Sequence, residues 1–260
     1  MMVAYAKKRF GQNFLIDPNI IRKIVKEINP QPGDVLVEIG PGKGALTRQL
    51  VATSAQIHAI EIDQDLTSEL AQELAGFDNF ALYQQDALQF DYPAHFSKSR
   101  KIRIVGNIPY NISSPLLFKI FENNNIIQDV HFLVQREIAQ RIGAKPNTKS
   151  YGILSVITQF YGKPSIAFQV SPKVFRPIPE VYSSLIKLII APHSQDTSFQ
   201  ADFHTVVKTA FGKRRKILRN SLANIIRERF DKCPIDLSRR AESLTLAEFM
   251  TLTDWICRGK

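Results

Sequence analysis

The sequence predicts an α/β protein in which a doubly wound, parallel sheet is followed by a small all-α domain. Short apolar runs alternate with helical patterns through the first half of the chain, which is typical of βαβ units. Residues 199–260 contain only helical patterns. A polar segment at residues 191–198 has the composition of a linker, so two domains are expected, at residues 1–191 and 198–260.

The elements of the first domain can be placed in order. Asp17 and Pro18 predict the N-cap and first residue of a helix over residues 18–28, which Asn29 and Pro30 end. Apolar runs predict strands at residues 34–40, 56–63, 80–86, 101–107 and 130–135. Helical patterns predict helices at residues 45–52 and 66–75, and a further helix capped by Ser114 and Pro115.

The pattern changes after residue 150. A helix is predicted over residues 151–160, and two strands at residues 165–170 and 183–190 are expected to add a hairpin to the sheet. Between these strands, the prolines of residues 171–180 predict a shaped loop without regular structure.

Composition restricts the class of partner. The 260-residue chain has 34 Lys+Arg against 24 Asp+Glu, a formal net charge of +10, which suits nucleic acid or an acidic membrane surface. Cys233 and Cys257 are too few for a disulfide framework, and no Cys/His cluster has metal-ligand spacing, so no metal is expected. The sequence has neither a signal peptide nor a membrane span, which favours the cytoplasm.

The segment EIGPGKG, residues 38–44, follows the first strand of the sheet and precedes a helix. Gly40 and Gly42 allow the backbone to approach a ligand closely, and Glu61 ends the second strand, where an acid commonly binds ribose hydroxyls. The pair indicates a nucleoside-containing cofactor. A nicotinamide dehydrogenase fits almost equally well, because Gly40, Gly42 and Ala45 match G-x-G-x-x-A. A glycine turn that only packs a helix is the weaker alternative.

A third acid, Asp86, ends the third strand at the same edge of the sheet. Its carboxylate could accept a hydrogen bond from an adenine amino group. Taken alone, Asp86 would more often be a helix N-cap or a solvated strand end. Its place beside the other two features favours the cofactor.

The segment GNIPY, residues 106–110, ends the fourth strand. The side-chain oxygen of Asn107 and a backbone carbonyl, that of Pro109 or Ile108, could each accept a hydrogen bond from the exocyclic amine of a base. Proline restricts the backbone, so these acceptors are positioned in advance. Tyr110 could stack on the ring. The alternative, a structural turn, is equally good for the segment in isolation.

The electrophile that the reaction needs distinguishes the two candidate cofactors, a methyl donor and a nicotinamide dinucleotide. An amine held by two acceptors calls for a methyl donor, and the sulfonium of S-adenosylmethionine is the candidate for the cofactor crevice. Hydride transfer would require a proton donor beside a carbonyl, and the strand ends offer none. Methyl transfer is therefore favoured.

The chain resembles the ribosomal small-subunit RNA adenine dimethyltransferases. Loss of the bacterial enzyme of this family confers kasugamycin resistance. Erythromycin-resistance methyltransferases and mitochondrial transcription factor B are relatives. The motifs that carry the resemblance lie at residues 7–15, 37–47, 60–63, 84–87, 106–115, 174–179 and 211–222. The resemblance implies a Rossmann-like class I S-adenosylmethionine-dependent methyltransferase sheet with a C-terminal helical RNA-binding domain.

The resemblance also assigns roles to residues. The residues that it places around S-adenosylmethionine are Gln12, Asn13, Leu15, Gly40, Gly42, Glu61, Asp86 and Asn107. Those that it places at the target base are Asn107, Pro109, Tyr110 and Phe175. From the sequence alone, Phe175 could equally be a core anchor between the loop prolines. The chain departs from the family in one place, because Glu180-Val181-Tyr182 stands where Lys-Val-Asp or Lys-Val-Asn is usual.

A run of basic residues opens the helical domain without an intervening acid. Its members are Lys208, Lys213, Arg214, Arg215, Lys216 and Arg219. Such a run is often only a solvated face, but here it accounts for much of the excess charge, so we expect it to bind RNA phosphates. The basic residues 7–9 could extend the same surface.

The function expected from the resemblance is N6,N6-dimethylation of two adjacent adenosines in a 3′-terminal hairpin loop of 16S rRNA. The partner would be the small (30S) ribosomal subunit or its precursor during ribosome biogenesis, and the enzyme is expected to be a cytoplasmic monomer. Two alternatives remain. One is a 23S rRNA adenine-N6 methyltransferase that confers macrolide resistance. The other is a non-catalytic RNA-binding assembly factor.

Overall fold

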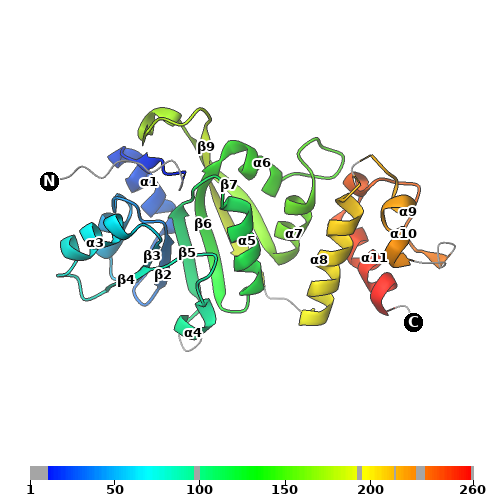
Figure 1. Ribbon diagram of the computed structural model, residues 1–260, viewed down its shortest axis with the longest axis horizontal. Coiled ribbons are helices and arrows are strands. Elements are labelled where there is room, and N and C mark those ends of the chain that lie inside the picture. The colour runs from blue at the N-terminus through cyan, green and yellow to red at the C-terminus, as the bar shows by residue number, and fades with distance from the viewer. Residues whose placement is uncertain (1–10, 97–99, 192–194, 214, 227–231, 259–260) are drawn as a thin grey trace. The chain divides into compact units, whose positions relative to one another are not determined.

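A computed structural model describes residues 11–96, 100–191, 195–213, 215–226 and 232–258 (Figure 1). The strands are β1 (Phe14–Leu15), β2 (Val35–Ile39), β3 (Gln56–Glu61), β4 (Phe80–Gln84), β5 (Ile102–Asn107), β6 (Ile127–Gln135), β7 (Gly162–Val170), β8 (Phe175–Arg176) and β9 (Ser183–Ile190). The helices of the first two thirds are α1 (Pro18–Ile28), α2 (Thr47–Val51), α3 (Gln64–Glu73), α4 (Tyr92–Phe96), α5 (Ser113–Glu122), α6 (Arg136–Ile142) and α7 (Ile153–Tyr161). The C-terminal helices are α8 (Thr197–Phe211), α9 (Leu218–Ser221), α10 (Ala223–Ile226) and α11 (Leu246–Arg258).

Seven strands form the main sheet in the order β4-β3-β2-β5-β6-β9-β7. The strands from β4 to β6 are parallel, and β9 runs antiparallel to β6. The chain builds outward from β2 in one direction and from β5 in the other. Because crossover connections are right-handed, the helices of the two halves cover opposite faces of the sheet. The predicted doubly wound sheet is therefore confirmed, and β9 and β7 are neighbours at its edge, as expected for the added hairpin.

The first helix shows how local sequence sets an element. The Asp17 carboxylate accepts hydrogen bonds from the backbone N–H groups of Asn19 and Ile20, and Pro18 occupies the first turn. Asn29 ends the helix in the left-handed conformation. The buried face of α1 carries Ile21, Ile24 and Ile28, which join the core against the sheet. The bounds predicted for this helix are confirmed.

Two local expectations need correction, and one element was not predicted. The helix for which Ser114 was the predicted N-cap begins two residues earlier, at Ser113, with Ile112 at its N-cap. The proline-rich loop is not without regular structure, because it contains a short 3-10 helix, Pro172–Val174, and strand β8. Strand β8 pairs with β1, a second sheet that the sequence did not predict. Such a two-residue pairing between distant segments leaves no periodic pattern in either segment.

The chain divides into two compact units that do not follow chain order. The first contains the described residues up to Ala139 together with Pro164–Ile190, and the second contains Gln140–Lys163 and the described residues from Ala191 onward. Residues 140–163 were expected in the first domain. They belong to the second unit because α7 packs on α8, with the rings of Phe160 and Phe203 stacked at 4.1 Å between centroids.

A buried ionic network ties α1 to the amino ends of the strands in the first unit. Arg103 on β5 donates hydrogen bonds to Asp129 on β6, to Asp34 before β2 at 2.7 Å, and to the carbonyl of Ile28 at the end of α1, also at 2.7 Å. Arg103 and Asp129 are almost entirely buried. Burial opposes the charge of Asp129, but the nearby His131, 3.6 Å away, and the hydrogen bonds from Arg103 hold the pKa of its carboxyl below the usual value.

We expect Arg103→Leu to lower the free energy of unfolding by about 3–5 kcal/mol, because Asp129 would remain buried without its cation. Urea denaturation measures this loss. Because the pKa of Asp129 is lowered on folding, the stabilisation is present above about pH 4 and is lost as the pH falls through the lowered value.

Arg48→Leu is the matched control, because Arg48 pairs with Glu73 on the surface of the same unit. Both side chains of that pair are 44% exposed, so its loss should cost about 1 kcal/mol or less. Equal losses in the two variants would show that burial of Arg103 adds nothing to its contribution.

Candidate functional site

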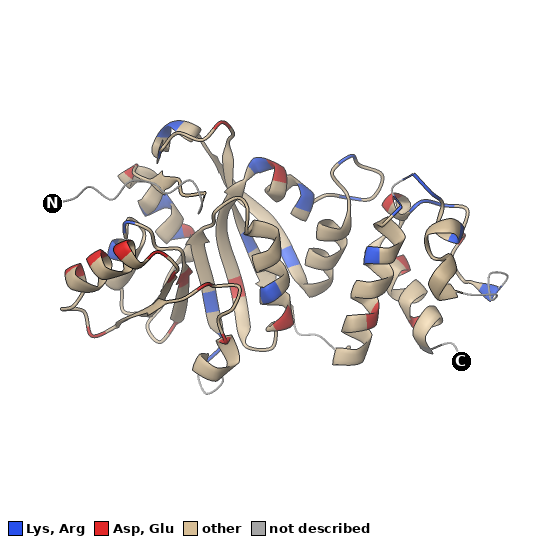
Figure 2. Cartoon of the chain, in the orientation of Figure 1, with Lys and Arg blue, Asp and Glu red and all other residues tan. Residues whose placement is uncertain are grey.

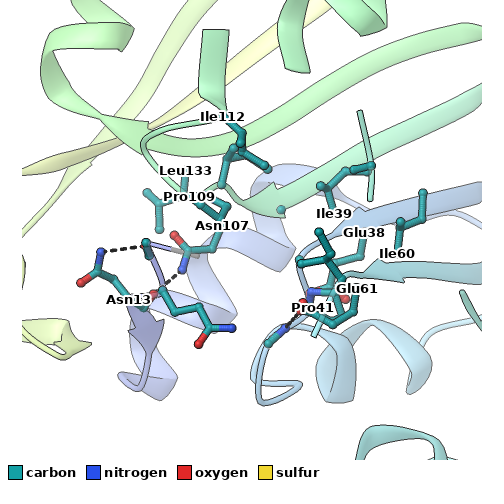
Figure 3. Close-up of a pocket in the computed structure, with 18 of the residues that line it drawn as sticks. Asn13, Glu38, Ile39, Pro41, Ile60, Glu61, Asn107, Pro109, Ile112 and Leu133 are labelled. Atoms are coloured by element: carbon teal, nitrogen blue, oxygen red, sulfur yellow. Dashed lines mark hydrogen bonds between the residues drawn. The ribbon is translucent and has the colours of Figure 1, made fainter. Parts of the chain in front are cut away.

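A cavity of about 220 Å³ opens at the carboxyl ends of β2, β3 and β5 in the first unit (Figure 3). This is the edge where the strand order reverses, the usual place for a ligand in an open α/β sheet. Its lining comes from residues 11–15, 38–43, 45–46, 60–62, 85–88 and 106–112, together with Ile24 and Leu133. Of the residues predicted to bind cofactor, all eight line this cavity.

The glycine loop is held by the carboxylate of Glu61. The backbone N–H of Gly42 donates to Oε2 of Glu61 at 3.1 Å, and that of Asp63 donates to Oε1 at 2.9 Å. Gly40 and Gly42 have φ values of 64° and 57°, in the left-handed region that favours glycine. One carboxylate therefore fixes both the loop after β2 and the end of β3.

Burial raises the pKa of Glu61, although the backbone hydrogen bonds partly oppose this shift. Glu61 is only 5% exposed, and each of its oxygens keeps a lone pair beyond the bond to its backbone donor. A carboxylate in this position suits hydroxyl groups, because each hydroxyl brings a proton to an acceptor that is already desolvated.

Glu38 is a second buried acid in the lining, and its role was not predicted from the sequence. Burial raises its pKa to about 8, and the nearby Glu61 adds to the rise. Its Oε2 is fully buried and has no hydrogen-bond partner among the described residues. A glutamate inside an otherwise apolar, buried strand was the signal that could have singled it out. With a pKa of about 8 this carboxyl is mostly neutral near pH 7, and a positively charged ligand beside it would favour its ionised form.

Asp86 lies at the adjacent strand end. Its Oδ1 accepts a hydrogen bond from the backbone N–H of Leu88 at 2.9 Å, so it caps the turn that follows β4. Among the described residues no group donates to Oδ2, and the residue lines the cavity. The capping role and the position suited to a ligand are both present in this one residue.

The N-terminal segment covers the cavity. Strand β1 pairs with β8, which places Leu15 opposite Phe175. Gln12 Nε2 lies 3.3 Å from Oδ2 of Asp63, and the ring of Phe14 lies 3.1 Å from the position that a Gly42 Cβ would occupy. A side chain at position 42 would therefore push the cover away from the glycine loop.

Asn107 joins this cover to the strand that ends at the cavity. Its Nδ2 donates to the carbonyl oxygen of Asn13 at 2.7 Å (Figure 3). The bond fixes which end of the amide is the donor, so Oδ1 is left as the acceptor, and no described residue donates to it.

The residues after Asn107 shape the mouth of the cavity. The carbonyl of Pro109 already accepts from the Ile112 N–H at 3.1 Å and from the Ser113 hydroxyl at 3.2 Å. No described residue donates to the carbonyl of Ile108. Of the two carbonyls that the sequence left open, that of Ile108 is therefore the available one. The Tyr110 hydroxyl lies 3.0 Å from that of Ser183, and burial raises the pKa of Tyr110.

Gly106 is a further requirement of the site that was not predicted from the sequence. A Cβ at this position would lie 2.5 Å from the backbone oxygen of Ile39. Glycine therefore lets β5 and β2 approach closely where the strand order reverses.

Phe175 is placed apart from the other residues predicted at the target base. Its side chain has no exposed surface, it belongs to the core cluster with Leu15, and it does not line the cavity. In this conformation it has the position of the core anchor, the alternative that the sequence left open. Contact with a base would require the β1–β8 region to move.

The basic run lies in the second unit, along the segment from α8 to α9 (Figure 2). The side chains of its described members are exposed: Lys208, Lys213, Arg215, Lys216 and Arg219. Arg214 lies outside the described residues, as do residues 7–9. In the described ranges, no group of three His, Cys, Asp or Glu side chains could hold a metal ion.

A model of the family described as ribosomal RNA adenine dimethylase matches residues 3–258. The chain belongs to this family. A member named ribosomal RNA small subunit methyltransferase A from Saccharophagus degradans is 43% identical over 257 residues, which cover 96% of this chain and 94% of that protein. A protein of the same name from Buchnera aphidicola is 46% identical over 254 residues, 96% of this chain and 92% of that one.

Solved structures agree on the fold of this family member. A dimethyladenosine transferase from Plasmodium falciparum superposes with a TM-score of 0.78 at 24% identity, covering 95% of this chain and 98% of that one. The 23S rRNA methyltransferase ErmE superposes with a TM-score of 0.70 at 23% identity, covering 94% and 99%. These likenesses confirm the predicted Rossmann-like methyltransferase fold.

The family makes the chain an S-adenosylmethionine-dependent rRNA adenine dimethyltransferase, as predicted. The cavity fits that methyl donor. It offers a glycine loop for close backbone approach, a desolvated carboxylate for hydroxyls, and the unpartnered Glu38 oxygen for a cationic group. The dehydrogenase alternative is excluded by the same comparison.

We expect Glu61→Gln to weaken S-adenosylmethionine binding by about 10- to 100-fold. The amide keeps one accepting oxygen, so its NH2 group would face the backbone N–H of either Gly42 or Asp63. That N–H would lose its acceptor, at a cost of about 1–3 kcal/mol. Isothermal titration calorimetry gives the dissociation constant. Glu69→Gln makes the same change on the exposed face of α3 and should bind the cofactor as the unmodified chain does. Unchanged affinity in Glu61→Gln would contradict the role given to this carboxylate.

Proposed function

We propose that the chain dimethylates adenine N6 in small-subunit rRNA, with Asn107 and the Ile108 carbonyl as the two acceptors that hold the amine. Support for the small subunit comes from the names of relatives that match nearly the full chain. The observation that carries the mechanism is the hydrogen bond from Asn107 Nδ2 to the Asn13 carbonyl, because it leaves Oδ1 directed to accept.

The chemistry begins with the poor nucleophilicity of the exocyclic amine. Its lone pair is delocalised into the adenine ring, so it reacts only when its two hydrogens are drawn out of the ring plane. Asn107 Oδ1 and the Ile108 carbonyl would each accept one hydrogen, and the nitrogen would turn its lone pair toward the cofactor side of the cavity. S-adenosylmethionine, when bound, supplies an electrophilic methyl group on its sulfonium.

The remaining residues position the reactants. Glu61 and Asp86 would hold the ribose and adenine portions of the cofactor, and the cover at Gln12, Asn13 and Leu15 would exclude water. Tyr110 would stack on the target base, with its hydroxyl anchored by Ser183. As the N–C bond forms, the methyl–sulfur bond would break and leave a neutral thioether. The alkylated nitrogen is strongly acidic and would release one of its protons to water, so no strong general base is required and these groups act by alignment.

The target base cannot be reached inside a duplex, so it must be unpaired or extruded, at a cost of a few kcal/mol. The family resemblance suggests two adjacent adenosines in a 3′-terminal hairpin loop of 16S rRNA, and we include that site in the proposal. The first unit would carry out catalysis and the second would contribute RNA binding. We further propose that the enzyme is a cytoplasmic monomer. Within the described residues, no helix has the length and apolar character needed to cross a membrane.

We expect Asn107→Ala to lower kcat by about 100-fold or more, because the amine loses one acceptor in a preorganised site. The cofactor dissociation constant should rise only about tenfold or less, since one hydrogen bond to the cover is worth about 0.5–1.5 kcal/mol. The assay is transfer of labelled methyl groups to undermethylated small subunits, with large-subunit RNA as the competing substrate.

Asn79→Ala is the matched control for this experiment. The Asn79 amide also donates to backbone carbonyls, those of Val51, Thr53 and Ala55. It lies at the amino end of β4, whereas the cavity lies at the carboxyl ends of the strands. This variant should lower stability and leave kcat unchanged.

The same assay on the unmodified chain separates the alternatives. Incorporation of methyl groups into large-subunit RNA instead would favour the macrolide-resistance alternative, and incorporation into neither RNA would favour a non-catalytic assembly factor.

The basic run is expected to bind RNA through its phosphates. Replacing Lys213 and Arg215 with Glu should weaken RNA binding and make the remaining affinity less dependent on salt, because fewer counterions are released. The slope of log K against log [salt] should become shallower by about 0.7–0.9 for each phosphate that the variant no longer neutralises. Filter binding over a range of salt concentrations measures both quantities. If neither affinity nor slope changes, the run is a solvated face.

A further inference from the structure

An exposed aromatic residue stands beside the cavity without lining it. Tyr182 directly precedes β9 and is 49% exposed. The Arg136 guanidinium lies over its ring, 5.7 Å from the centroid, and the Arg136 N–H donates to the Tyr182 carbonyl at 2.9 Å. Two contacts thus hold this cation and this ring together, one between the side chains and one along the backbone.

The position of Tyr182 connects it to the predicted base pocket. The next residue, Ser183, is buried, and its hydroxyl lies 3.0 Å from that of Tyr110. Consecutive Cα atoms are only about 3.8 Å apart, so Tyr182 lies immediately outside the wall on which Tyr110 is anchored. A strand of RNA that places one nucleotide against Tyr110 would bring a neighbouring nucleotide close to Tyr182.

The chemistry of this surface suits an unpaired nucleotide. Arg136 is exposed and forms no ion pair with any described residue, so its charge is available for a phosphate. Ile178 and Val181, on the same loop, are 57% and 43% exposed. An aromatic face beside an available cation binds single-stranded nucleic acid by stacking and by neutralising phosphate.

We propose that Tyr182 and Arg136 form a stacking platform for the nucleotide that flanks the target adenine. The flanking base stacks on the Tyr182 ring, and Arg136 supports that ring and contacts the adjacent phosphate. The platform holds the RNA strand in register, so that the neighbouring adenine remains extruded at Tyr110. This inference rests on the proposed function, because a flanking nucleotide requires RNA as the substrate.

The test is a double-mutant cycle on RNA binding, which needs no turnover. The full chain is titrated with a protein-free hairpin that carries two adjacent adenosines in its loop, and with hairpins in which one flanking nucleotide is abasic. Tyr182→Ala should bind the intact hairpin about 5- to 150-fold more weakly, the range for loss of one aromatic platform. One of the abasic hairpins should remove most of this difference. Arg136→Ala should also bind weakly and should show a shallower salt dependence.

Two variants serve as controls. Tyr182→Phe keeps the ring and should bind as the unmodified chain does. Phe77→Ala removes another exposed aromatic residue, which is 42% exposed and precedes the amino end of β4. This variant should also bind RNA normally. Cofactor affinity should be unchanged in every variant, which shows that each one is folded.

Several results would overturn the proposal. Normal binding by Tyr182→Ala, equal losses in Tyr182→Phe, or equal losses for intact and abasic hairpins would each exclude a stacking platform. A loss seen only with small subunits that carry ribosomal proteins would indicate that the surface contacts protein instead. Absence of methyl transfer by the unmodified chain would overturn the proposed function, while the binding cycle would still report on the platform.

Discussion

The side-chain amide of Asn107 donates a hydrogen bond to the carbonyl of Asn13, and the arrangement of the cavity depends on this contact. It connects the end of a central strand to a segment that lies 94 residues earlier and covers the cavity. The same bond decides the chemistry of the residue, because an amide that donates through nitrogen must accept through oxygen. Covering the cofactor and presenting an acceptor to the amine are thus two consequences of one contact.

Around this contact, the edge of the sheet is organised by groups that tie neighbouring strands together. Glu61 accepts from the glycine loop and from the start of α3, and Gly106 lets β5 pack against the backbone of β2. Both devices act where the strand order reverses, which is where a doubly wound sheet leaves room for a ligand. The amino ends of the same strands are closed by the Arg103 network, so the stabilising charges and the reactive edge are kept apart.

Sequence patterns predicted what depends on local periodicity and turn chemistry. The helix from Pro18, the five parallel strands and the glycine loop all carry such signals, and the cavity residues followed because parallel strand ends meet at one edge. Pairing between distant residues carries no such signal. The β1–β8 sheet, the placement of residues 140–163 with the C-terminal helices, the burial of Phe175 and the choice of the Ile108 carbonyl over that of Pro109 are all decided by long-range packing or hydrogen bonding.

In the proposed mechanism, Asn107 keeps its donor on the cover and offers its oxygen to the adenine amine. A crystal structure of the chain with S-adenosylhomocysteine and a hairpin containing the target adenosines tests this directly. We expect adenine N6 at about 2.7–3.2 Å from both Asn107 Oδ1 and the Ile108 carbonyl, with Nδ2 still bonded to Asn13. An amide turned so that Nδ2 faces the base, or N6 bonded to the Pro109 carbonyl instead, would contradict the mechanism.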